Sequence, residues 1–180
     1  MDKTISPAKS ALQFGVLFGV LMILELVISF VTNINPASNR AYGIVINLLN
    51  FLIMPVGLIL LGCNNFKNKI NSGFISLSEA LKVGVTVCVI AALVYGIFSA
   101  VFNMIFPEFV EEILRNAKTA MLQQNPEMPK EQMEMALSFT KKFMNPVIAI
   151  PATVIMYAFI GLIYSLIIGA IIKKEAQQSF

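Results

Sequence analysis

"SLSEALKVGVTVCVIAALVYGIFSA", residues 76 to 100, is the stretch that decides the fold. Every fourth residue in it is small, and small residues at this spacing let two membrane helices approach closely. Each step of four advances about 40° around a straight helix, so the series winds most of the way round. We therefore expect a central helix, crossed right-handedly by different partners at its two ends. This small-residue ladder comprises Ser76, Ala80, Gly84, Cys88, Ala92, Gly96 and Ala100.

The start of this helix is also encoded locally. Ser76 followed three residues later by Glu79 forms a capping box, in which each side chain accepts from the backbone N–H of the other residue. Asn71 to Gly73 supply the turn before it. Lys82 lies one turn in, where its long stem reaches the headgroups and acts as a depth anchor.

The composition places the chain in a membrane. Of its 180 residues, 57% are hydrophobic and 13% are charged, against about 25% charged residues in a soluble domain. A helix crosses the hydrocarbon core in roughly 20 residues, and the first apolar run is too long for a signal peptide. We expect one all-α domain over residues 1–180, a four-helix transmembrane bundle with spans at 11–31, 41–62, 77–106 and 146–172.

Shorter small-residue motifs and the two cysteines occur in these spans. We interpret the motifs as further docking faces, and the cysteines as small apolar packing residues. The motifs are Gly15 and Gly19 in the first span and Gly161, Ser165 and Gly169 in the fourth, and the cysteines are Cys63 and Cys88.

The distribution of lysine and arginine predicts the orientation. Positive residues near span ends favour the cytoplasmic side, and the short loop at residues 32–40 carries only Arg40. Both termini are therefore expected in the cytoplasm, although the segment 107–145 opposite also carries five basic residues. The cytoplasmic set is Lys3, Lys9, Lys67, Lys69, Lys173 and Lys174.

Glu25 is the one carboxylate well inside a span, and such a residue is a functional hypothesis by default. One interpretation is a proton- or cation-responsive site. The other is a protonated carboxyl that hydrogen-bonds Asn50 and serves packing. Pro55 is expected to kink the second span and to free carbonyls toward this cluster. The residues expected in similar membrane layers are Asn47, Asn50, Thr153 and Tyr157.

Between the third and fourth spans, residues 107–145 change character. Two helical patterns, starting at Pro107 and Pro129, are separated by "QQNPEMP". We expect an extracytoplasmic amphipathic hairpin that lies on the outer membrane surface or caps the bundle.

Methionines gather in this segment and permit three interpretations. They could form an adaptable surface for a partner, a thioether site for Cu(I), or simple packing of a membrane-lying hairpin. The candidate partner surface is Met121, Met128, Met133, Met135, Phe139 and Phe143.

Several classes of function lack their motifs. The chain has no His, P-loop, GxSxG, HExxH or CxxC, and no pair of buried carboxylates is available for acid/base work. The net charge of +3 comes from scattered ends without a basic stripe for nucleic acid. We expect no enzyme, no metal, no cofactor, no nucleic-acid partner, and find no small-molecule substrate signature.

The segment "NNFKNKINSGFISLSEALKVG" resembles a bacterial family known as domain of unknown function 4199. The residues that carry the resemblance are Ile75, Ser76, Ala80, Lys82 and Gly84, while Leu77 stands where the family more often has Phe. The resemblance implies a small multi-span protein of the bacterial inner membrane without assigned activity, and it transfers no catalytic residues.

The sequence leaves three functions open. The leading hypothesis is a non-enzymatic accessory or scaffold subunit that binds a membrane-protein or extracytoplasmic partner, or a second copy, through 107–145. The alternatives are a small ion- or proton-coupled transporter or channel component using Glu25, and a sensor of lipid or membrane stress that contacts lipid through the same segment.

Overall fold

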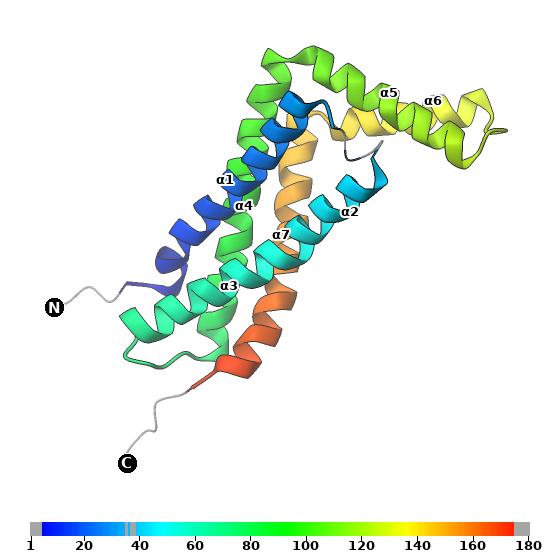
Figure 1. Ribbon diagram of the computed structural model, residues 1–180. Coiled ribbons are helices and arrows are strands. Elements are labelled where there is room, and N and C mark those ends of the chain that lie inside the picture. Colours follow the sequence, from blue (N-terminus) through cyan, green and yellow to red (C-terminus); the bar gives the residue numbers. More distant parts are fainter. Residues whose placement is uncertain (1–4, 35, 37–38, 175–180) are drawn as a thin grey trace.

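A computed structural model describes residues 5–34, 36 and 39–174, so Lys3 lies outside the described residues. Within them every named element is a helix, and no strand is formed (Figure 1). The helices in chain order are α1 Pro7–Thr32, α2 Arg40–Leu48, η1 Leu49–Ile53, α3 Met54–Asn65, η2 Phe66–Ile70, α4 Leu77–Ile105, α5 Pro107–Gln124, α6 Lys130–Phe143 and α7 Pro146–Ile172.

Four helical segments in the described part of the chain are long and apolar enough to cross a membrane, at 7–32, 40–70, 77–105 and 146–172. The chain is thus a multi-pass membrane protein, and the predicted all-α four-helix bundle is confirmed. The second segment continues eight residues past the predicted end at 62, because the polar turn "FKNKI" stays helical as η2. The other predicted ends differ from the observed ones by four residues or fewer.

Helix α4 lies between α1 and α7 and packs along both (Figure 1). On the α1 side, a Cβ added to Gly15 would lie 2.7 Å from Ile90 Cβ, and one on Gly19 would lie 2.7 Å from Val94 Cβ. Both glycines therefore allow α1 to rest directly on α4. The expectation that the third span is central agrees with this arrangement.

The small-residue ladder meets one partner, α7, near both of its ends, so the prediction of different partners is wrong. A Cβ on Gly161 would lie 2.7 Å from the Gly84 carbonyl oxygen, and one on Gly169 would lie 2.9 Å from Ala80 Cβ. Toward the other end, Gly96 faces Ile150. The prediction assumed a straight partner parallel to α4, whereas α7 stays beside α4 along the ladder, so the line of contact moves around α4 (Figure 1).

The second membrane segment changes character at Pro55. Proline lacks an N–H, which leaves the carbonyl four residues earlier without its helical donor. That carbonyl, on Phe51, accepts from the Tyr164 hydroxyl at 2.7 Å. The prediction that it points toward the Glu25 cluster is therefore wrong. The backbone just before Pro55 widens into the π-helical turn η1, which contains Asn50.

The end of the bundle that carries the first and last described residues is closed by direct contacts. The backbones of Ile75 and Lys174 exchange two hydrogen bonds of 2.9 Å. Lys67 Nζ donates to the Ile172 carbonyl at 2.8 Å and so caps α7. Ser76 Oγ accepts from the Glu79 N–H, and the Glu79 carboxylate accepts from the Ser76 N–H, so both halves of the capping box are present.

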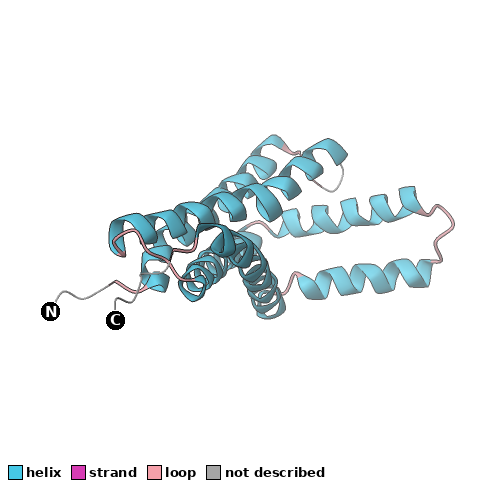
Figure 2. Ribbon diagram, turned by 90° about the horizontal axis from the view of Figure 1, so that it is seen from below, coloured by secondary structure: helices cyan, strands magenta, loops and turns pink. Residues whose placement is uncertain are grey.

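Helices α5 and α6 form an antiparallel hairpin that projects sideways from the opposite end of the bundle (Figure 2). It does not lie over the bundle as a cap. Phenylalanine rings fix its root: Phe30 of α1 packs against Phe102, Phe106 and Phe109 with centroid distances of 4.9 to 5.7 Å. The sequence analysis did not single out this aromatic cluster.

Candidate functional site

A cavity of about 540 Å³ opens in the hairpin half of the bundle, between α1, the second segment, α4 and α7. It exists because α2 leaves the bundle beyond η1, whereas α3 packs against α1, α4 and α7 (Figure 1). At the end of the cavity nearest the hairpin, Phe109 and Ile113 of α5 and Phe143 of α6 complete the wall.

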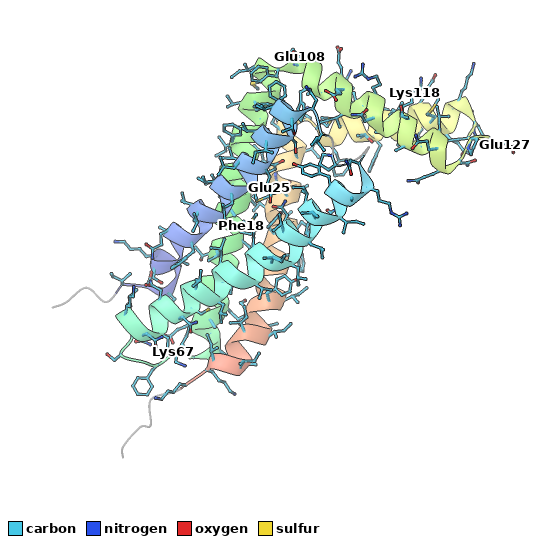
Figure 3. The ribbon with its side chains drawn as sticks, viewed as in Figure 1. Phe18, Glu25, Lys67, Glu108, Lys118 and Glu127 are labelled. Carbon is cyan, nitrogen blue, oxygen red and sulfur yellow. The ribbon has the colours of Figure 1, made fainter. Side chains whose placement is uncertain are left out.

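Glu25 lies in the wall of this cavity, on the face of α1 toward the second segment (Figure 3). Asn50 donates a hydrogen bond from Nδ2 to Glu25 Oε2 and a second one, of 3.1 Å, to the Ile46 carbonyl. Because a π turn changes the direction in which side chains project, η1 presents Asn50 to α1. The partner that the sequence named for Glu25 is thus its hydrogen-bond partner.

The other members of the predicted intramembrane cluster lie around the same cavity. Asn47, Thr153 and Tyr157 all line it, although none of them has a hydrogen bond to Glu25. Asn47 is exposed, Thr153 is half-buried, and Tyr157 is buried. The structure therefore brings together five residues from α1, α2, η1 and α7.

A polar stripe on α4 completes the wall and was missed by the sequence analysis. Tyr95, Ser99 and Asn103 follow one another at intervals of four and all line the cavity. The signal was present, because polar residues at this spacing share one face of an otherwise apolar helix. The pattern was overlooked because the small-residue ladder has the same spacing and lies one residue further along, at Gly96 and Ala100.

Toward the other end of the bundle the cavity is closed by packed side chains. Phe18, one turn before Met22 on α1, is fully buried, and its ring meets Tyr157 edge-on at a centroid distance of 5.8 Å. Nearer the end of the bundle that carries the chain ends, three more side chains are fully buried: Ile59, Val83 and Val87. The cavity is therefore a pocket with one closed end.

The candidate partner surface divides in the structure. Met133 is buried, so its thioether is not available to a partner. Met121 and Met128 are half-buried. Met135 and Phe139 remain 69% and 62% exposed. The members of the candidate partner surface that are exposed on α6 are Met135, Phe139 and Phe143, which are spaced by four residues.

The sequence also singled out one lysine, Lys82, and two cysteines, Cys63 and Cys88. Lys82 is exposed near the closed end of the bundle. Cys63 and Cys88 are buried and free, and Cys63 Sγ lies 3.9 Å from the Ala80 carbonyl. No group of three or more Cys, Asp or Glu side chains that could hold a metal ion occurs among residues 5–34, 36 and 39–174.

Comparison with known proteins gives a family and no function. The model of the family described as protein of unknown function, DUF4199, matches residues 13–174. No curated protein and no solved structure matches the chain. Since the family model covers most of the sequence, the chain belongs to the DUF4199 family.

Proposed function

We propose that this member of the DUF4199 family binds a small amphiphilic molecule in the cavity around Glu25. The observation that carries the proposal is the wall, which combines polar side chains from five elements with aromatic and aliphatic ones. A volume of about 540 Å³ lies within the range of roughly 300–1,000 Å³ typical of small-molecule sites. The role is one of binding, because Glu25 is the one carboxylate that the described residues bring to the wall and its neighbour is an amide.

Binding of a neutral fluorescent probe tests this proposal. N-phenyl-1-naphthylamine is titrated into the full chain in lipid nanodiscs, and its emission is compared with that in empty discs. We expect Ser99→Phe to weaken binding at least about tenfold, because the new ring occupies the cavity. Val101→Phe is the matched control, since Val101 lies two residues further on α4 and is 50% exposed. Equal binding by wild type and Ser99→Phe would refute the cavity as the binding site.

Ion conduction through Glu25 is a weaker candidate, because the closed end of the pocket would have to open at Phe18 and Tyr157. Flux across vesicles containing the purified chain tests it. Flux that Glu25→Gln abolishes would favour a transporter or channel component. Absent or unchanged flux would leave ligand binding as the role.

The accessory role expected from the sequence is the second candidate function. It is supported by Met135, Phe139 and Phe143, which expose an apolar strip on α6. Native mass spectrometry of the full chain would show a bound partner or a second copy that Phe139→Glu releases. Glu131→Gln, an exposed change at the start of α6, is the control. A monomer with no partner would exclude this role.

Contact of the hairpin with lipid is tested separately. The hairpin runs sideways from the bundle, as a helix pair lying on a membrane surface would (Figure 2). Phe139→Cys labelled with a polarity-sensitive dye should shift to the blue in vesicles if the strip lies in lipid. An emission spectrum typical of water would exclude lipid sensing through this strip.

For orientation we propose that both termini are cytoplasmic in a bacterial inner membrane. Lys9, Lys67, Lys69, Lys173 and Lys174 cluster at the closed end of the bundle, which supports this placement. The native cysteines are buried, so single added cysteines report cleanly. An impermeant maleimide on intact spheroplasts should label Ser138→Cys and spare Ser78→Cys. The reverse pattern would invert the topology.

A further inference from the structure

Two hydrogen-bond acceptors in the cavity wall lack a donor. Glu25 Oε1 and Asn50 Oδ1 are buried and have no hydrogen-bond partner among the described residues. Asn50 as a whole is only 9% exposed, and it lines the cavity. Buried acceptors without donors are costly and uncommon in folded proteins. The pair therefore indicates a donor that comes from outside the described chain.

The charge around these acceptors has one sign. Among the described residues, Glu25 is the one side chain of the acidic or basic types in the wall, and neither Lys nor Arg lines it. A carboxylate away from bulk water strongly favours a positive partner at short range. The missing donor is therefore best supplied by a group that also carries positive charge.

The rest of the wall suits the apolar part of such a ligand. Phe51 and Tyr157 stack at a centroid distance of 6.0 Å beside the polar pair, and aromatic faces attract cations as well as hydrocarbon. Toward the hairpin the wall consists of Phe109, Ile113 and Phe143. Tyr42 of α2 still reaches Ser29 of α1 with a hydrogen bond of 2.8 Å, but α2 diverges from α7, so a hydrocarbon chain can leave the cavity toward lipid between α2 and α7 (Figure 1).

We propose that the ligand is an amphiphile with a protonated amine head. Its N–H groups donate to Glu25 Oε1 and Asn50 Oδ1, and its carbon chain lies along the aromatic wall. The terminal torsion of a glutamate is soft, so a small rotation turns Oε1 from its covered position into the cavity. This inference rests on the proposed binding function and specifies its ligand.

A protonated Glu25 is the competing explanation. In that case the hydroxyl of the carboxyl itself becomes the donor, and the pair serves packing without any ligand. A cavity with a neutral wall then has no preference between charged and uncharged heads. The head-group preference of the site therefore separates the two explanations.

The experiment uses the full chain in phosphatidylcholine nanodiscs and undecyl chains with a dansyl group at one end. The other end is a primary ammonium, a trimethylammonium, a hydroxyl or a carboxylate. We expect the primary ammonium probe to bind at least about tenfold more tightly than the hydroxyl probe. The trimethylammonium probe, which has the charge but no N–H, should have an affinity between these two. The carboxylate probe should bind most weakly. This comparison needs no variant and so does not depend on the folding of a mutant.

Variants then localise the preference. Glu25→Gln should remove most of the tenfold difference, whereas Glu131→Gln, which removes an exposed carboxylate at the start of α6 and outside the cavity wall, should leave the difference intact. Displacement of the ammonium probe by phosphatidylethanolamine would identify a lipid head as the source of the amine, and a lack of displacement would identify a free alkylamine. Equal binding of all four probes, blocked by Ser99→Phe, would overturn the inference and leave the binding function standing. Binding of none of them would overturn both.

Discussion

The two halves of the bundle are built from the same apolar helices and differ in what lies between them. In the half with the chain ends, Gly84 meets Gly161 at backbone distance, and Phe18, Ile59 and Val87 are fully buried. In the hairpin half, polar side chains surround a cavity. Small residues at helix contacts thus bring helices together, and η1 with Pro55 marks where the second segment leaves them. The following predictions test this difference, starting with the largest effect.

Gly84→Ala should break the packed half. The added methyl group would lie 3.1 Å from the Gly161 carbonyl oxygen and against Ser165, and backbone cannot move aside as a side chain can. We expect the free energy of unfolding to fall by about 2–3 kcal/mol. Gly57→Ala is the control, because nothing lies within 4 Å of a Cβ there, and it should be neutral or gain up to about 1 kcal/mol. Reversible unfolding in mixed micelles measures both, and equal stabilities would refute the close contact.

Ser76→Ala should weaken the start of α4 by about 1 kcal/mol. The change removes the acceptor for the Glu79 N–H and keeps a small residue at the first position of the ladder. Ser78→Ala provides the matched control, since Ser78 is exposed two residues further on. The same unfolding assay applies. A loss that is the same for both serines would mean that the cap contributes nothing specific.

The polar pair in the open half should be coupled by about 0.6 kcal/mol, the average for hydrogen bonds between membrane helices. A double-mutant cycle with Glu25→Ala and Asn50→Ala measures this coupling. The parallel cycle with Asn47→Ala should give zero, because Asn47 lines the cavity without a hydrogen bond to Glu25. Coupling of equal size in both cycles would indicate a general effect of the cavity.

Ser99→Phe should have the smallest effect on stability, within about 0.5 kcal/mol, because the cavity has room for the ring. The corresponding enlargement in the packed half, Val87→Phe, should cost about 1–3 kcal/mol, since Val87 is fully buried. Similar losses for the two variants would show that the halves are packed alike.

Much of the packed half was predictable from the sequence because its determinants are local. The capping box at Ser76 needs a spacing of three residues, and the approach of α4 to another helix needs small residues at a spacing of four. The identity of that helix was not predictable. The ladder meets α7 near both ends, and the path of one helix along another is a property of two helices together.

The candidate site was predictable in part. Glu25 and Asn50 are unusual in a membrane span and lie in matching layers, so the sequence paired them correctly. The stripe of Tyr95, Ser99 and Asn103 has the same spacing of four as the ladder, but it was not predicted because the longer ladder lies one residue further along. Met133 was assigned to the candidate partner surface and is buried, which is a property of the tertiary structure.

The sequence by itself determined the class of the protein, its four membrane segments, the cap of α4 and the presence of a carboxyl in the membrane. These follow from hydropathy, helix length and side chains a few residues apart. The tertiary structure alone decided that α7 follows the ladder, that Tyr164 takes the carbonyl freed by Pro55, and that α2 diverges to leave a cavity. Such features depend on the relative directions of whole helices, which no short spacing encodes.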